Sequence, residues 1–223
     1  MSALPELRIS EEVASRHPGL RAKLLTIDGV RARPLDERLE ALKAEVQRRI
    51  SAERTLEGLR DDPIFRAYRD FLWSVGIDPT KTRPASEALV RRILSGRGLP
   101  RVNTVVDSYN LASALSGIPM AAFDADRLSG EVLTMRFSRR GEEFLGIGMD
   151  SPRALTGREI LVEDGAGPIA IYLYRDAART MVTESTRRVL LMICGVPGIP
   201  EEALDEAGRL AERIIGDYSS LTK

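Results

Sequence analysis

Three polar residues, Asn103, Asp107 and Asn110, are spaced by four and three positions in a stretch with helical periodicity, so they lie on one face of the predicted helix. Solvent-facing helix positions are usually Glu, Lys, Arg or Gln, because Asn and Asp lower helix propensity. The interleaved valines indicate a partly buried polar lining. Two amides and a carboxylate can bind an ammonium, a hydroxyl or a ribose. The same side chains could instead cap loops and hydrogen-bond within the fold, so both alternatives stay open.

Basic residues concentrate just before this helix. Between Pro79 and Arg101 the chain carries six basic residues and one acid, Glu87, although its 33 basic and 33 acidic residues balance overall. Arg83 precedes the predicted start of a helix, where free N–H groups and the helix dipole favour anions. We expect Arg83 to contact a phosphate or a carboxylate, with a solvated helix face as the alternative. Because the net charge is zero, any nucleic-acid contact depends on such a local patch.

The chain has one cysteine, Cys194, and one histidine, His17. No intrachain disulfide can form, and a zinc site would need mostly carboxylates, so we expect no metal and no other cofactor. Cys194 lies in an apolar stretch, which predicts a buried, inert thiol. His17 lies in a Ser-Arg-His-Pro-Gly turn, and we expect no catalytic role for it. No nucleophile elbow, P-loop or dinucleotide fingerprint is present.

Helices that position these side chains dominate the first half of the chain. Apolar residues recur every three or four positions over 35–50, which predicts an amphipathic helix. Asp62 can cap a second helix over 63–75, whose aromatic residues are expected in the core. Two more helices are expected over 84–95 and 102–115, and each is followed by a glycine that can end it.

Strands follow in the middle of the chain. Alternation over 133–137 predicts one strand, and two more flank a hairpin turn at Asp164-Gly165. Residues 189–193 predict a buried strand or a short helix, and a last helix is expected over 201–218.

This pattern predicts an α+β or mixed α/β fold with a central mixed sheet and a C-terminal helix. We expect one domain over 1–223, divided into an N-terminal part to residue 76, a core over 77–198 and the last helix over 199–223. A chain of 223 residues, 43% of them hydrophobic, can bury a sizeable core. The N-terminus lacks the apolar region of a secretory signal, and the apolar runs are too short to span a bilayer. We expect a cytoplasmic protein with neither a membrane nor DNA as a partner.

Two adjoining motifs resemble a known family. Residues 99–110 read Leu-Pro-Arg-Val-Asn-Thr-Val-Val-Asp-Ser-Tyr-Asn, and residues 117–130 read Gly-Ile-Pro-Met-Ala-Ala-Phe-Asp-Ala-Asp-Arg-Leu-Ser-Gly. They resemble the tRNA-editing domain of the phenylalanyl-tRNA synthetase β subunit, where an Asn-x-Val-Val-Asp-x-x-Asn helix precedes a Gly-x-Pro-x-His-Ala-Phe-Asp turn. Further parallels at 139–144, 164–170 and 182–191 follow in the same order. The chain is similar to freestanding relatives of that domain.

The resemblance implies hydrolysis of a wrong amino acid, tyrosine in the family, from tRNA. Such an editing site is a second sieve, which hydrolyses wrong products that the synthetic site did not reject. Its substrate is a reactive ester, so a positioned water and a stabilised oxyanion can be enough for hydrolysis without a Ser-His-Asp triad. The expected partner is the aminoacylated 3′ end of a tRNA or a small amino-acid-like ligand. The competing interpretations are a non-catalytic module that binds tRNA or an amino acid, and a small-molecule hydrolase on a reused fold.

The resemblance also implies roles for individual residues. Asn110 matches a pocket asparagine of the family, and Asn103 and Asp107 match helix positions of the motif. Asp124 matches the aspartate of the turn. Asn110 and Asp107 would orient the aminoacyl or ribose end of the substrate, and Arg83 would contact a phosphate or a carboxylate.

Two positions depart from the family pattern. The histidine of the family's turn falls on Ala121, and the glutamate that would recognise the tyrosine hydroxyl falls on Met192. A Gly-Gly segment of the family is replaced by residues 175–179. A more apolar pocket around Ala121 and Met192 suits a side chain other than tyrosine.

Overall fold

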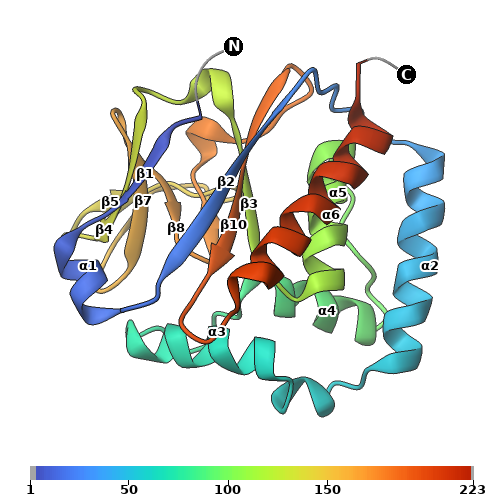
Figure 1. The fold of residues 1–223 in the computed structure, drawn as a ribbon, viewed down its shortest axis with the longest axis horizontal. Coiled ribbons are helices and arrows are strands. Elements are labelled where there is room, and N and C mark those ends of the chain that lie inside the picture. The colour runs from blue at the N-terminus through green and yellow to red at the C-terminus, as the bar shows by residue number, and fades with distance from the viewer. Residues whose placement is uncertain (1–3, 222–223) are drawn as a thin grey trace.

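The computed structural model describes residues 4–221 of the chain. The strands in this range are β1 (Glu6–Ile9), β2 (Arg21–Asp28), β3 (Met120–Asp124), β4 (Val132–Phe137), β5 (Glu143–Phe144), β6 (Arg153–Ala154), β7 (Ile160–Asp164), β8 (Gly167–Ile171), β9 (Arg175–Asp176) and β10 (Arg188–Gly195). They form a five-stranded sheet in the order β1-β4-β7-β8-β9, a three-stranded sheet in the order β2-β10-β3, and a short pair of β5 and β6 (Figure 1).

The α-helices in the described range are α1 (Glu11–Arg16), α2 (Glu37–Glu53), α3 (Pro63–Ser74), α4 (Ala85–Leu94), α5 (Thr104–Ser116) and α6 (Glu201–Ser219). From α2 to α6 they lie where the sequence predicts helices, with bounds that differ by at most three residues. The α+β class is therefore confirmed, and residues 189–193 belong to a strand. Within the described range, no helix combines the length and the apolar character that crossing a membrane requires.

The start of α3 shows why these helices were predictable. Oδ1 of Asp62 accepts hydrogen bonds from the backbone N–H groups of Ile64 and Phe65 at 2.9 and 3.3 Å. This cap satisfies two donors that have no partner within the helix. Phe65, Tyr68 and Phe71 are buried in the core, as predicted, whereas Trp73 of the same helix is 56% exposed, contrary to the expectation for its aromatic residues.

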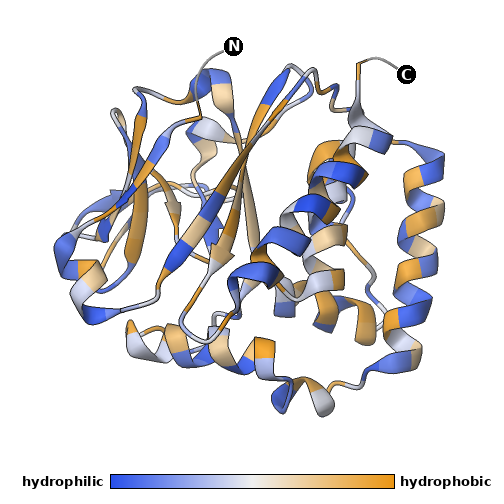
Figure 2. Ribbon diagram, in the orientation of Figure 1, coloured by the Kyte–Doolittle hydropathy of each residue, from blue (hydrophilic) through white to orange (hydrophobic). Residues whose placement is uncertain are grey.

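The three-stranded sheet is the middle layer of the molecule (Figure 1). On one side α6 packs on β2 and β10 and against α5, and α2 packs farther out against α4 and α5. The five-stranded sheet lies on the other side (Figure 1). Figure 2 shows hydrophilic residues along the outer face of α6, which is the face turned away from the sheet. The central strand β10 is buried over 189–195, as expected for a strand covered on both faces.

The strands expected from the sequence are distributed over separate sheets, and the segment that forms β3 was expected to be a turn. Gly117 ends α5 in the left-handed conformation (φ 76°), and every residue of β3 is buried. A strand buried on both faces shows no polar alternation, so hydrophobic periodicity cannot reveal it. Asp124 ends this strand and caps the 3₁₀ turn Ala125–Arg127.

Two tyrosine hydroxyls join other elements to the end of β10. The Tyr172 hydroxyl lies 2.8 Å from the carbonyl oxygen of Arg21 and 2.9 Å from that of Gly195. The Tyr68 hydroxyl donates a hydrogen bond of 2.6 Å to the carbonyl oxygen of Cys194. These contacts connect α3 and the segment after β8 to the three-stranded sheet, beside the cavity described next.

Candidate functional site

A cavity of about 700 Å³ lies among the two sheets, α4 and α5. This volume is within the range that small-molecule sites usually occupy. Residues far apart in the sequence line it, including Arg92 of α4, Tyr109 and Asn110 of α5, Ala121 of β3, Tyr174, Arg175 and Asp176 at β9, and Met192 and Cys194 of β10. Three of the residues named from the sequence, Asn110, Ala121 and Met192, therefore meet in one cavity.

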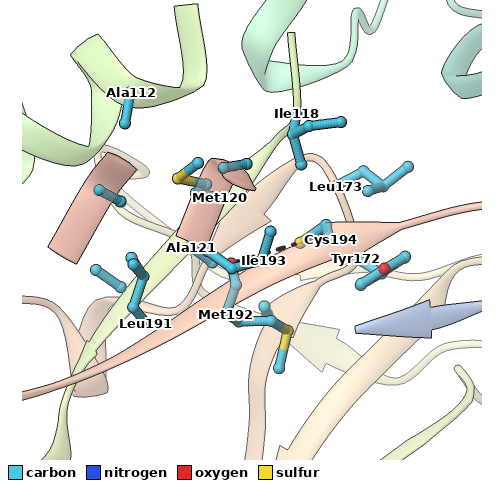
Figure 3. Packing of buried hydrophobic residues seen from close by; sticks show 14 of the residues in the cluster. Ala112, Ile118, Met120, Ala121, Tyr172, Leu173, Leu191, Met192, Ile193 and Cys194 are labelled. Atoms are coloured by element: carbon cyan, nitrogen blue, oxygen red, sulfur yellow. Dashed lines mark hydrogen bonds between the residues drawn. The ribbon is translucent and has the colours of Figure 1, made fainter. Parts of the chain in front are cut away.

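Ala121 and Met192 form one wall of this cavity. They are paired directly across the antiparallel strands β3 and β10, so both side chains lie on the same face of the sheet. In Figure 3, Met192 leaves β10 on the side opposite to Leu191. The two positions at which the chain departs from the family pattern are thus neighbours, and together they make this wall apolar.

Asn110 brings an amide to the cavity from the second half of α5. Its side chain is partly buried and makes no hydrogen bond to another described residue. A partly buried amide carries two donors and one acceptor that require partners. The Asn110 amide is therefore available to a ligand.

Asn103 and Asp107 do not line this cavity, although the sequence places them on the same helical face as Asn110. Oδ1 of Asn103 caps α5 by accepting a bond of 3.0 Å from the Val106 N–H. Asp107 is buried, its Oδ2 pairs with Lys43 Nζ at 2.8 Å, and its Oδ1 accepts from the Val102 N–H at 2.9 Å.

The expectation that one polar face lines a ligand site thus fails for its first two members. The seven residues from Asn103 to Asn110 correspond to a rise of about 10 Å along the helix axis. Side chains on one helical face can therefore have different neighbours, and the start of α5 contacts α2 rather than the cavity.

Asn103 gives a direct test of the capping role. Replacing it by Ala is expected to lower the free energy of unfolding by about 1 kcal/mol, because one backbone N–H at the start of α5 loses its acceptor. Chemical denaturation of both proteins would measure this difference. Replacement by Asp, which also caps, should restore most of the loss, and equal stability of all three proteins would contradict the role.

Arg83 and Asp124 also lie outside the cavity wall. Arg83 is exposed immediately before α4, two residues from Ala85, which does line the cavity. Asp124 is buried, and its Oδ2 accepts a bond of 2.7 Å from the Thr186 hydroxyl. Arg83 is therefore an exposed residue two positions from the cavity lining in sequence, and Asp124 is used within the fold.

The basic stretch before α5 is partly neutralised within the protein. Glu87 is 1% exposed and pairs with Arg91 at 2.7 Å and with Arg69 at 2.8 Å. Arg101 pairs with Glu40 at 2.8 Å. Simple counting of charges along the sequence therefore overstates the positive charge that this region offers to a ligand.

Asp176 lines the cavity and was not singled out from the sequence. Burial raises the pKa of its carboxyl from 3.8 to about 7, and the neighbouring Arg175 opposes this shift only in part. Its charge also helps to raise the pKa of the Tyr109 hydroxyl, whose main cause is burial. The one available signal was that this aspartate falls in the segment that replaces the family's Gly-Gly.

Two arginine side chains at Tyr174 add positive charge to the same region. The Arg153 guanidinium lies 5.5 Å from the centroid of the Tyr174 ring, and that of Arg175 lies 5.6 Å from it. Tyr174 and Arg175 both line the cavity. Arginines stacked on an aromatic ring form a surface that suits phosphate and bases.

Leu173, in the loop between β8 and β9, also lines the cavity and has an unusual backbone. Its φ is 70°, the left-handed region that residues with a side chain rarely adopt. Its carbonyl oxygen accepts a hydrogen bond of 3.3 Å from the Ala85 N–H at the start of α4. Strained residues of this kind concentrate at binding sites, where the surroundings hold them in place.

Cys194 and His17 behave as structural residues. Cys194 is 2% exposed, and burial raises the pKa of its thiol, which disfavours the reactive thiolate. His17 packs edge-on against Phe71 at 5.4 Å beside a separate hollow of about 620 Å³, and burial lowers the pKa of its imidazole. Among residues 4–221, no group of three or more His, Cys, Asp or Glu side chains could hold a metal.

Comparison with known proteins identifies the family of the segment that forms this cavity. The sequence model of the B3/4 domain matches residues 67–208, a range that includes every residue lining the cavity. The chain is 35% identical over 108 residues to the phenylalanine–tRNA ligase beta subunit of Gloeobacter violaceus, an alignment that covers 48% of this chain and 14% of that protein. With the same subunit from Nocardia farcinica it is 30% identical over 147 residues, or 63% of this chain and 17% of the relative.

A solved structure shares the fold. It is an N-terminal fragment of the phenylalanyl-tRNA synthetase beta subunit from Pyrococcus horikoshii, with a TM-score of 0.52 and 12% identity, and the match covers 96% of this chain and 49% of that one. This chain spans about half of that fragment and less than a fifth of the length of the full-length relatives. Because the family model covers well over half of its residues, the chain belongs to the B3/4 domain family and is a relative of the phenylalanyl-tRNA synthetase β subunit.

Proposed function

We propose that the cavity binds the amino acid at the 3′ end of an aminoacyl-tRNA and that the protein hydrolyses the ester between them. The observation that carries this proposal is the unpaired amide of Asn110 inside a cavity of about 700 Å³. The named activity of the relatives, ligation of phenylalanine to tRNA, supports tRNA as the partner.

Hydrolysis of an aminoacyl ester requires a correctly positioned water molecule rather than a nucleophilic side chain of the protein. An aminoacyl ester is activated, so water can attack its carbonyl carbon once it is held in line. The oxyanion that forms needs a hydrogen-bond donor, and the NH₂ group of Asn110 can serve. Asp107 supports this arrangement from a distance, because its ion pair with Lys43 holds α5 against α2.

Basic side chains beside the cavity would bind the rest of the nucleotide. Arg83 is exposed before α4, and the Arg153–Tyr174–Arg175 cluster lies at β6 and β9. Such contacts to phosphate position a nucleic acid without reading its sequence. Binding of tRNA should therefore weaken as salt concentration increases.

A panel of mischarged tRNAs tests the activity. The wild-type protein should release one amino acid or a small set of similar ones, and Asn110→Ala should lower the rate about 100-fold or more. Asn103→Ala is the matched control, because it removes the same amide from the same helix but outside the cavity. Equal deacylation rates for the two variants would show that Asn110 has no role in the reaction.

A non-catalytic tRNA-binding module is the second candidate, favoured by Ala121 at the position of the family's histidine. Under that reading, no tRNA in the panel is deacylated, yet tRNA binds in a salt-dependent way. Reversal of the charges at Arg153 and Arg175 should abolish that binding.

The apolar wall predicts which side chain is accepted. A tyrosine hydroxyl against Ala121 and Met192 would lose its hydrogen bonds to water and gain none from these two residues, so tyrosine should be disfavoured. Met192→Glu should raise kcat/KM for tyrosyl-tRNA, relative to the best apolar substrate, by about tenfold. Met192→Leu is the control that keeps the wall apolar. An unchanged ratio in the Met192→Glu variant, with the fold verified by circular dichroism, would show that this wall does not select the side chain.

A further inference from the structure

We propose that Asp176 is the counter-charge for a protonated amine, so that the cavity selects ligands that carry a free α-ammonium group. This inference deepens the proposed function, since it assigns the recognition of the amino group within the same cavity. It does not require hydrolysis, and it can be tested by binding alone.

The first observation is that, among the described residues that line the cavity, Asp176 is the only one with a carboxylate. Its backbone carbonyl accepts a hydrogen bond of 2.9 Å from the Ile147 N–H, which fixes the short strand β9. Its carboxyl group, in contrast, makes no hydrogen bond to another described residue. The carboxylate therefore has unused acceptors in a recess where hydrogen-bond partners are usually present.

The second observation concerns the two arginines of the cavity, which do not form an ion pair with Asp176. Nη1 of Arg175 donates to the carbonyl oxygen of Ile147 at 2.8 Å, and Nε of Arg92 donates to that of Gly98 at 3.1 Å. Both guanidinium groups are thus held by backbone oxygens, and in the described range no ion pair is formed by Asp176.

The third observation is electrostatic. A half-buried carboxylate without a partner is unfavourable, and this partial burial raises the pKa of Asp176. Its negative charge acts on the Tyr109 hydroxyl of α5 and the Cys194 thiol of β10, since it contributes to the raised pKa of both groups. The charge of Asp176 therefore acts on two other residues that line the cavity, where a ligand would lie.

The chemistry of an aminoacyl ester matches this single negative charge. Esterification removes the carboxylate of the amino acid, so the aminoacyl group keeps one charge, its α-ammonium. A half-buried carboxylate has lost part of its hydrogen bonding to water, and a positive group placed against it compensates for that loss. With the amine at Asp176, the carbonyl can face the Asn110 amide and the side chain can face Ala121 and Met192, all of which line the same cavity.

Amino-acid amides are suitable probes, because they carry the free amine, lack the carboxylate and resist hydrolysis. Binding of leucinamide, methioninamide and phenylalaninamide to the full chain would be measured by calorimetry near neutral pH, each beside its N-acetyl derivative. At least one amide should bind about tenfold tighter than its acetylated form. Asp176→Asn should remove that preference, whereas Asp150→Asn, the same change at an exposed position outside the cavity, should keep it.

Other outcomes would overturn the proposal. They are equal affinity for amides and acetylated amides, a preference that survives in the Asp176→Asn variant, and no binding of any amide. If Asp176→Asn abolished tRNA deacylation while the preference for the amine persisted, Asp176 would act on the water instead. Conversely, amine selection without any deacylation would support Asp176 as the counter-charge and reject the proposed hydrolysis.

Discussion

Replacing Lys43 by Met should lower the free energy of unfolding by about 3–5 kcal/mol, the largest stability loss that we expect from one substitution. Nζ of Lys43 lies 2.8 Å from Oδ2 of Asp107 and 2.7 Å from Oε1 of Glu40, and it donates to the carbonyl oxygen of Pro100 at 3.1 Å. The side chains of Lys43 and Asp107 are 3% and 4% exposed. Removing the ammonium leaves a buried carboxylate without its counter-charge, which costs far more than an exposed ion pair contributes.

Urea denaturation of a double-mutant cycle would measure this effect. Combining Lys43→Met with Asp107→Leu removes both charges, so the double variant should be more stable than the Lys43→Met variant alone. Val102 would still lose its acceptor on Asp107, so full recovery is not expected. A double variant at least as unstable as the sum of the single ones would show that the pair is not coupled.

Asp176→Asn should make the protein more stable than the wild type at pH 8, but not at pH 4. The folded protein raises the pKa of this carboxyl from 3.8 to about 7, so it holds a proton that the unfolded chain has already released. The contribution of Asp176 to stability is therefore complete below about pH 4 and is lost as the pH rises through about 7. Asparagine does not titrate, so its contribution to stability does not change with pH. Because water can enter the cavity, we expect a difference of roughly 2 kcal/mol between the pH limits rather than the full value for three pKa units.

Denaturation curves of the two proteins at several pH values would test this expectation. Other titrating groups, such as the imidazole of His17, are present in both proteins and cancel in the difference. Asp150→Asn is again the control. The difference in free energy of unfolding between this variant and the wild type should not change between pH 4 and pH 8 as it does for Asp176→Asn. Parallel stability curves for wild type and Asp176→Asn would show that burial does not disfavour the charged carboxyl.

Much of this protein follows from local sequence chemistry. Helix bounds depend on neighbours within four residues, so Asp62 and Gly117 mark a helix start and a helix end without any tertiary information. The motif that contains Asn110 also led to the family, and Asn110, Ala121 and Met192 do meet in one cavity. The roles that we assign to these residues stay predictions until binding and hydrolysis are measured.

Tertiary structure alone decided the rest, because contacts between distant segments determine it. The strand at β3 exists through its pairing with β10, some seventy residues later in the chain. Asn103, Asp107 and Asn110 share a helical face. Asp107 forms an ion pair with Lys43 of α2, however, whereas Asn110 lines the cavity. Asp176 is an ordinary aspartate in the sequence. Only the tertiary structure brings it beside residues of α5 and β10 that line the same cavity, and partial burial there raises the pKa of its carboxyl.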